Sequence, residues 1–201
     1  MDIKKIKKIG IAGAGGIGSN LLAVLFDYGY NRKQFDYSGM EVDIYDDDVV
    51  DTSNLLHQRF TLDDVGKHKV KVLEEKFVVN GITKFMTEKD LKKYDVVFSC
   101  VDSMEFRKML YNYGWKHGKD APFWIDGRCT SRTGALFNSE LPKNQLEPYI
   151  DDSKETGGCL LAWEKEENIS HALPIIISGM MLQTFLNYLR GQRTDKKILM
   201  V

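Results

Sequence analysis

The chain has 201 residues, of which 43% are hydrophobic and 28% are charged, and its formal net charge is −1. This length and composition are typical of one globular domain, and the balanced charge argues against nucleic acid or a membrane surface as a partner. No apolar run reaches the roughly 18 residues of a membrane span or has the form of a signal segment, and the three cysteines form no C-x-x-C pair. We therefore expect a single domain over residues 1–201, a cytoplasmic location and no zinc knuckle.

A glycine-rich turn follows the first predicted strand, residues 7–12. Its sequence, GAGGIGSN, places Gly13, Gly15 and Gly18 in the pattern G-x-G-x-x-G. In a strand–turn–helix unit these glycines permit a tight turn, a close approach to phosphate and close packing of the helix. The helix predicted over residues 16–28 would point free N–H groups at an anion. The pattern favours a nucleotide or phosphate site over its alternative, a purely structural turn.

A second strand is predicted over residues 42–46, and it ends in the acidic run Asp46, Asp47 and Asp48. Ligands of open α/β sheets bind at the carboxyl ends of the strands. A carboxylate at this position can accept hydrogen bonds from ribose hydroxyl groups. The run therefore indicates ribose recognition, with a turn or a helix cap as the alternative interpretation.

The following elements alternate between helices and strands. We expect a loop over residues 51–60, helices over 67–79 and 104–117, and strands over 83–87, 95–100, 123–126 and 134–138. The apolar, β-branched run DVVFSC at 95–100 is typical of a buried parallel strand. This alternation predicts an α/β, Rossmann-like fold with a mostly parallel sheet and helices on both faces.

The pattern changes after Asn138. Residues 141–170 contain two prolines, a Gly157-Gly158 pair and many charges, so we expect a long crossover loop within the same domain. The last predicted helix, residues 173–189, is apolar nearly all round, which indicates burial in the fold or against a partner. Together with the hydrophobic tail at residues 198–201 it predicts a homodimer.

Four motifs occur in order along the chain: GAGGIGSN from Gly13, DDDVVDTSNL from Asp46, GKHK from Gly66 and DVVFSCVDSMEFR from Asp95. In this combination the sequence resembles the ThiF/MoeB-like family, the prokaryotic relatives of ubiquitin-activating enzymes. The resemblance covers about residues 9–107, and more loosely a GGC segment and the last helix. It implies a Rossmann-like enzyme that uses ATP and magnesium to adenylate the free C-terminal carboxylate of a ubiquitin-like protein or a peptide.

The resemblance also implies roles for particular residues. Asp46 matches the acid that binds ribose, Lys69 matches a lysine that contacts phosphates, and Asp102 matches an aspartate that binds magnesium. The transition state of adenylation spreads charge over phosphate oxygens, which cations in fixed positions stabilise. The nucleotide site implied in this way comprises Gly13, Gly15, Gly16, Gly18, Asp46, Asp48, Asn54, Arg59, Lys69 and Asp102.

The sequence departs from the family pattern in its arginines. His57 stands where the family usually has an arginine, and no N-terminal helix precedes the first strand to bring one from a neighbouring protomer. An imidazole is mostly neutral at pH 7, so we predict that Arg59 supplies the missing charge. Arg128 and Arg132 are other candidate clamps, with surface arginines as the alternative interpretation.

Cys159, in the GGC segment, roughly matches the cysteine that some family members use for thioester chemistry, and the alternative is a packed or incidental thiol. The paired zinc cysteines of many relatives are absent. The predicted catalytic residues are Arg59, Lys69, Asp102 and Cys159.

We thus expect an ATP-dependent adenylyltransferase, and two alternatives stay open. One is a NAD-dependent oxidoreductase, because the glycine pattern and an acidic strand end also serve dinucleotides. Asn54, Lys69 and Asp102 argue against it, since hydride transfer needs none of them. The other is a non-catalytic nucleotide-binding scaffold or regulatory partner of the same fold, which the missing arginine favours.

Overall fold

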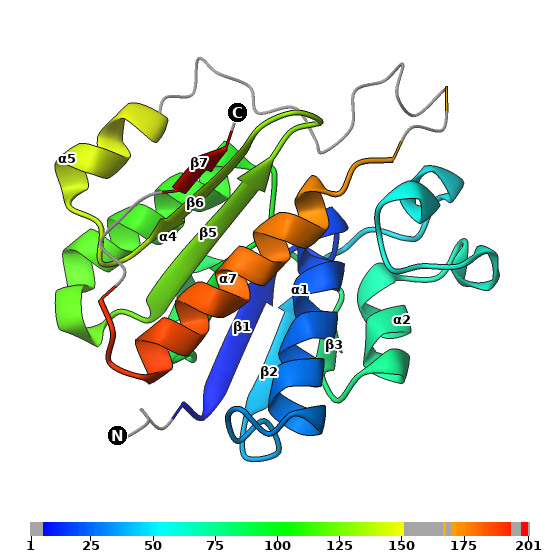
Figure 1. Ribbon diagram of the computed structural model, residues 1–201, viewed down its shortest axis with the longest axis horizontal. Coiled ribbons are helices and arrows are strands. Elements are labelled where there is room, and N and C mark those ends of the chain that lie inside the picture. The colour runs from blue at the N-terminus through cyan, green and yellow to red at the C-terminus, as the bar shows by residue number, and fades with distance from the viewer. Residues whose placement is uncertain (1–5, 151–166, 168–169, 194–197, 201) are drawn as a thin grey trace.

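The computed structural model describes residues 6–150, 167, 170–193 and 198–200, and the described residues form one seven-stranded sheet (Figure 1). The strand order is β3-β2-β1-β4-β5-β6-β7. The first five strands are parallel, and β6 and β7 are antiparallel to their neighbours. The strands are β1 (Lys8–Ala12), β2 (Glu41–Tyr45), β3 (Asn80–Ile82), β4 (Val96–Ser99), β5 (Phe123–Cys129), β6 (Gly134–Asn138) and β7 (Ile198–Met200).

Helices cover both faces of the sheet, which confirms the predicted Rossmann-like α/β fold. Helices α1 and α7 lie side by side on one face together with α2, and α4 lies on the other face with α3 and α5 (Figure 1). None of the helices in the described ranges combines the length and apolarity needed to cross a membrane. The helices are α1 (Gly16–Phe26), α2 (Lys69–Lys76), α3 (Glu88–Leu91), α4 (Met104–His117), α5 (Lys143–Leu146) and α7 (Leu173–Leu189).

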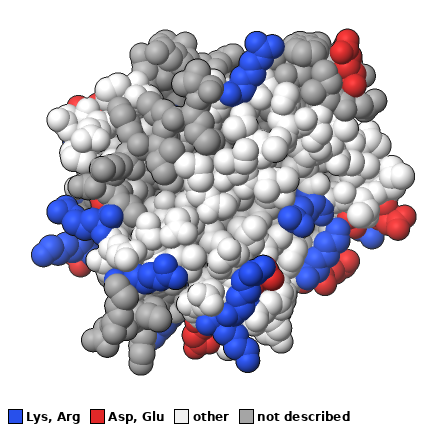
Figure 2. Space-filling model, in the orientation of Figure 1, with Lys and Arg blue, Asp and Glu red and all other residues white. Residues whose placement is uncertain are grey.

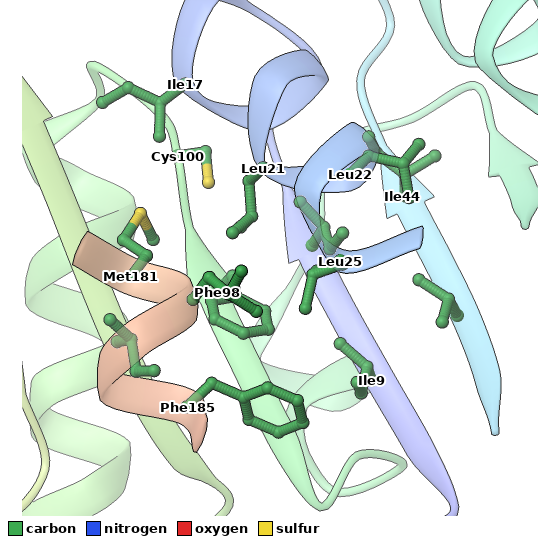
Figure 3. Packing of buried hydrophobic residues seen from close by; sticks show 14 of the residues in the cluster. Ile9, Ile17, Leu21, Leu22, Leu25, Ile44, Phe98, Cys100, Met181 and Phe185 are labelled. Carbon is green, nitrogen blue, oxygen red and sulfur yellow. The ribbon is translucent and has the colours of Figure 1, made fainter. Parts of the chain in front are cut away.

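The larger core fills the space between the sheet and the α1–α7 pair. Figure 3 shows side chains of α1, α7 and the sheet pointing toward one another there. The rings of Phe98 and Phe185 meet edge to face, with their centroids 5.7 Å apart. Helix α7 approaches the sheet closely because β5 has a glycine beneath it, and a Cβ atom at Gly127 would lie 2.4 Å from Sδ of Met181. The predicted burial of α7 is therefore confirmed on its inner side, whereas Ile175 and Ile176 on its outer side are exposed.

The prediction of the third strand was wrong. It lies at Asn80–Ile82, where it pairs with β2, and not at residues 83–87. Gly81 allows this pairing, because a Cβ atom there would lie 2.4 Å from the Val70 carbonyl oxygen of α2. Residues 83–87 instead leave the sheet, and Thr87 caps the unpredicted helix α3 through a capping box with Asp90.

The ends of two helices also differ from the prediction. The α-helical part of α1 ends at Phe26, and a π-helical turn over Asp27–Asn31 follows it directly. Helix α2 begins only at Lys69, because the two preceding residues pair with the segment after β2: the Val50 N–H donates to the Lys67 carbonyl oxygen at 2.8 Å.

The expected crossover loop, residues 141–170, begins with two short helical turns, α5 and a 3-10 turn at Glu147–Tyr149. Most of its remainder, residues 151–166 and 168–169, lies outside the described residues. That one domain extends over the whole chain stays a prediction.

Candidate functional site

A cavity of about 1040 Å³ opens at the carboxyl ends of the parallel strands. It lies beside β1, which separates β2 from β4 at the point where the strand order reverses, the usual place for a ligand in an open α/β sheet. The predicted nucleotide-site residues that line it are Gly13, Gly15, Gly16, Asp46, Asp48, Asn54, Lys69 and Asp102. These residues come from four separate segments, which the fold brings together at one cavity.

The glycine turn is shaped to leave its backbone open to the cavity. Gly13 has φ +93°, and a Cβ atom there would lie 2.7 Å from the Cys100 carbonyl oxygen at the end of β4. Gly18 does not line the cavity, but a Cβ atom on it would lie 1.9 Å from the Gly13 carbonyl oxygen. Around Gly15 no atom lies within 4 Å of such a position. The start of α1, at Gly15, Gly16 and Ile17, therefore lines the cavity, and a helix N-terminus at a cavity is suited to an anion.

Asp46 ties the end of β2 to the glycine turn. Its carboxylate accepts hydrogen bonds from the Ala14 N–H at 2.7 Å and from the Asp48 N–H at 2.9 Å. Burial raises the pKa of Asp46, and these two N–H groups and the charge of Lys69 oppose that rise. Because a carboxylate has about four acceptor positions, Asp46 can still accept hydrogen bonds from hydroxyl groups of a ligand.

Lys69 brings a positive charge to the same side of the cavity. The residue is only 6% exposed, and its ammonium group forms an ion pair of 2.6 Å with the exposed carboxylate of Asp48. The backbone N–H of Lys69 also donates to the Asp48 carbonyl oxygen at 3.0 Å. Asn54 lies nearby in a 3-10 turn, where its side chain accepts from the Asp51 N–H at 2.9 Å. The lysine is thus held in place from both its backbone and its side chain.

Asp102 lies on the opposite side of the glycine turn, in the turn between β4 and α4. Its side chain is exposed at the cavity. Helix α4 begins immediately after it, because the Ser103 hydroxyl accepts a hydrogen bond from the Phe106 N–H at 3.2 Å. An exposed carboxylate with its backbone fixed by a helix cap is a suitable ligand for a hard cation such as magnesium.

A buried ionic cluster lies beneath this second side of the cavity, and the sequence analysis missed it. Its centre is Asp126 of β5, which is fully buried. The carboxylate of Asp126 accepts hydrogen bonds from Arg128 at 2.8 Å and Arg107 at 3.3 Å, and also from Tyr111 at 2.6 Å and Ser99 at 2.7 Å. Burial alone would raise the pKa of Asp126, but the two guanidinium groups hold it at about 2. The cluster is therefore ionised and carries one positive charge in excess.

The arginines do not lie where the sequence analysis expected them. Arg128 is buried in the ionic cluster and lines the cavity, so its interpretation as a surface residue was wrong. Arg132 is exposed and does not line the cavity. Arg59 is also exposed outside the cavity lining, and its Nε donates to Asn20 of α1 at 2.9 Å. The neighbouring His57 does line the cavity, where it packs against Gly16.

Two further segments line the cavity without having been predicted. Phe85 and Met86 follow β3, and Phe85 is 67% exposed although it is large and apolar. Cys129 is the last residue of β5, and Thr130 begins the turn to β6. Exposed apolar side chains at a cavity rim offer a surface to a flat apolar group. Cys159, the predicted thioester cysteine, lies outside the described residues.

Comparisons with known proteins agree with this fold. The model of the ThiF family matches residues 2–199. The structure of PaaA has a TM-score of 0.65 and 15% identity, covering 96% of this chain and 60% of that chain. Escherichia coli MccB with AMPCPP and MccA has a TM-score of 0.66 and 16% identity, with the same coverage of 96% and 60%. MccB with ATP has a TM-score of 0.64 and 17% identity, covering 91% and 55%.

At these identities the structures show a shared fold. The chain spans about 60% of the length of the PaaA and MccB chains. No curated protein matches the chain.

Proposed function

The chain belongs to the ThiF family, and from that membership we propose that it is an ATP-dependent adenylyltransferase that activates the C-terminal carboxylate of a peptide or a ubiquitin-like protein. The observation that carries the proposal is a single cavity lined by the glycine turn, Asp46, Lys69 and Asp102. These groups suit the phosphates, the ribose and the metal of a nucleoside triphosphate. Solved MccB structures contain ATP or the peptide MccA, which supports the choice of substrates.

In this proposal the groups around the glycine turn bind the nucleotide. Asp46 accepts hydrogen bonds from the ribose hydroxyls, and Phe85 offers an apolar surface to the base. The N–H groups at the start of α1 and the ammonium of Lys69 receive the phosphates. Hydrogen bonds to charged groups of this kind each contribute about 1.5–3 kcal/mol.

The residues present fit a magnesium ion that arrives with the nucleotide. Magnesium prefers oxygen ligands and is usually held by one or two carboxylates together with substrate phosphates. The exposed carboxylate of Asp102 is the group that would hold it. When bound, the ion neutralises charge on the phosphate oxygens.

The acceptor is expected on the β5–β6 side of the cavity, where Cys129 and Thr130 lie. Its carboxylate is already an anion, so it attacks the α-phosphorus of ATP without a general base. Pyrophosphate leaves as the acyl-adenylate forms.

A thioester step at Cys159 and a cytoplasmic location are further parts of the proposal.

Exchange of labelled pyrophosphate into ATP tests the reaction. Peptides with a free C-terminus should support exchange, and the same peptides with an amidated C-terminus should not. A peptide library that gives no exchange in either form, combined with tighter calorimetric binding of NAD than of ATP with magnesium, would contradict the proposal and favour the oxidoreductase.

A non-catalytic nucleotide-binding partner is the second candidate. The position of Arg59 favours it, because the guanidinium bonds to Asn20 outside the cavity lining. This candidate expects calorimetric binding of ATP with magnesium but no pyrophosphate exchange with any free-carboxylate peptide. The two measurements together therefore separate all three functions.

A homodimer is also part of the proposal. Figure 2 shows the face that carries α1 and α7, where Lys and Arg side chains lie mostly around the edge and the centre is nearly free of charge. Ile175 and Ile176 are exposed near the start of α7. Sedimentation at high micromolar concentration should give a dimer, and a monomer there would contradict this part.

A further inference from the structure

Arg107 contacts both peptide groups that flank Asp102. The arginine is 3% exposed and extends from α4 into the turn after β4. Its Nη2 donates to the Val101 carbonyl oxygen at 2.5 Å, and its Nη1 donates to the Asp102 carbonyl oxygen at 3.4 Å. One carbonyl belongs to the peptide group before the Asp102 Cα atom, and the other belongs to the peptide group after it.

Fixing these two peptide groups fixes the backbone of Asp102. The orientation of the first group sets φ of this residue and the orientation of the second sets ψ, since a peptide group is planar. Together they determine the direction in which the Cα–Cβ bond of Asp102 leaves the chain, and so the region that its carboxylate can reach. The backbone that carries an exposed side chain is in this way oriented by two part-buried contacts.

Arg107 is in turn held by the ionic cluster. Its Nε donates to Oδ1 of Asp126 at 3.3 Å, and the same oxygen accepts from the Ser99 hydroxyl at 2.7 Å. Oδ2 of Asp126 accepts from Tyr111 and Arg128. Because the guanidinium group is planar and its donors form a rigid fork, a fixed Nε also fixes the two Nη groups.

We propose that Arg107 is a positioning residue that sets Asp102 for a divalent cation bound with a nucleotide. The proposal rests on the function proposed above and adds a requirement for the fork of Arg107, beyond its charge. The competing explanation is that the positive charge of the cluster alone favours the bound phosphates. A lysine at this position separates the two, because it keeps the charge but has a single donor group that cannot bond to both carbonyls and Asp126 in the same geometry.

Binding of Mn²⁺, measured by electron paramagnetic resonance in the presence of AMPCPP, tests the proposal without turnover. Partners that orient a metal ligand typically change metal affinity about 10–100-fold. We expect Arg107→Lys and Asp102→Asn each to weaken Mn²⁺ binding by about this factor. Calorimetric affinity for AMPCPP without metal should stay close to wild type in Arg107→Lys.

Arg128→Lys is the matched control. It makes the same exchange in the same cluster, but Arg128 bonds to the Tyr149 carbonyl oxygen at 2.8 Å and not to the turn that carries Asp102. Its Mn²⁺ affinity should fall clearly less than that of Arg107→Lys even where its melting temperature falls as much, and an equal loss in the two variants would contradict the positioning role.

The outcomes separate this inference from the proposed function. Wild-type Mn²⁺ affinity in Arg107→Lys, with a loss in Asp102→Asn, overturns the positioning role and leaves the adenylation proposal standing. Unchanged affinity in both variants overturns both the positioning role and the assignment of Asp102 as the metal ligand, because the metal then binds elsewhere, and the adenylation proposal is then decided by pyrophosphate exchange. If Arg107→Lys does not fold, Ser99→Ala removes one hydrogen bond from the Asp126 oxygen that Arg107 contacts, and wild-type Mn²⁺ affinity in that variant overturns the proposal.

Discussion

The two sides of the cavity are built by different means. On the β1–β2 side the cavity is lined by the glycine turn, by Asp46, which accepts two backbone hydrogen bonds, and by the ion pair of Lys69 with Asp48. On the β4–β5 side the turn with Asp102 rests on side chains, the ionic cluster of Arg107, Asp126 and Arg128. The first side depends on the glycine turn, where a Cβ atom at Gly13 or Gly18 would lie too close to backbone atoms. The second side depends on buried charges that must remain paired.

This difference determines which changes each side tolerates. Loss of a ligand-facing group on the first side removes a contact to the ligand and leaves the core intact. Loss of the Asp126 charge leaves two buried guanidinium groups without their anion, which is strongly destabilising. Variants on the first side should therefore change ligand binding alone, whereas variants on the second side should change both ligand binding and the free energy of unfolding.

The largest expected effect follows from Asp126→Asn. The change leaves Arg107 and Arg128 buried without an anion, and breaking a buried ion pair in this way costs about 3–5 kcal/mol of folding free energy. Urea unfolding measures it. The control is Asp47→Asn, an exposed aspartate that should change stability by less than about 0.5 kcal/mol. Equal stability of the two variants would remove the contrast between the two sides.

Asp102→Asn should abolish pyrophosphate exchange while its unfolding curve stays that of wild type. An exposed metal ligand contributes to the reaction barrier and not to the core, and metal ions supply several kcal/mol of charge stabilisation in such reactions. Full turnover by this variant would place the metal elsewhere.

Lowering the pH should reduce the difference in unfolding free energy between wild type and Asp126→Asn. The pKa of Asp126 falls from 3.8 to about 2 on folding, so its ionisation stabilises the fold above the unfolded value and this contribution is lost as pH falls toward the folded value. Asparagine has no such titration. Urea midpoints at pH 5 and pH 3 should show the difference in stability shrinking, and a constant difference would argue against a paired, ionised Asp126.

Asp46→Ala should weaken ATP binding by about 1–3 kcal/mol, the scale of hydrogen bonds to a charged group. The loss should be smaller for dATP, because it lacks the 2′-hydroxyl. Calorimetry with both nucleotides measures the difference. Identical losses would show that Asp46 does not contact the 2′ position.

The smallest effect is expected at Arg59, which we propose adds positive charge near the start of α1. An exposed charge pair contributes about 0–1 kcal/mol, so Arg59→Ala should slow exchange by a few-fold. Arg132→Ala is the matched control, since this arginine is also exposed and outside the cavity lining. Equal rates of pyrophosphate exchange in wild type and in both variants would contradict a role of Arg59.

Sequence patterns predicted the parts of the fold and site that depend on local backbone. The glycine turn, the acidic end of β2 and the helix at Met104–His117 each follow from a few neighbouring residues. Strand β3 was misplaced because its strongest determinant, close contact between Gly81 and α2, joins residues that only the folded chain brings together.

The ionic cluster could not be predicted for the same reason. Arg107, Tyr111 and Asp126 are separated by up to 19 positions, and no spacing rule connects a strand residue with two helix residues behind it. Arg59 illustrates the opposite error. Its distance along the chain from His57 is short, yet the turn directs the two side chains to different surroundings.

The ion pair between Lys69 and Asp48 has a consequence for the binding of anions. An incoming phosphate must compete with the Asp48 carboxylate for the ammonium group, which limits how tightly any anion is retained. When an anion leaves, the Asp48 carboxylate is close enough to pair with the Lys69 ammonium group again. The buried lysine therefore always has a negatively charged partner. Asp48 is thus placed to displace an anion from Lys69, an arrangement that favours exchange of a bound anion over its tight retention.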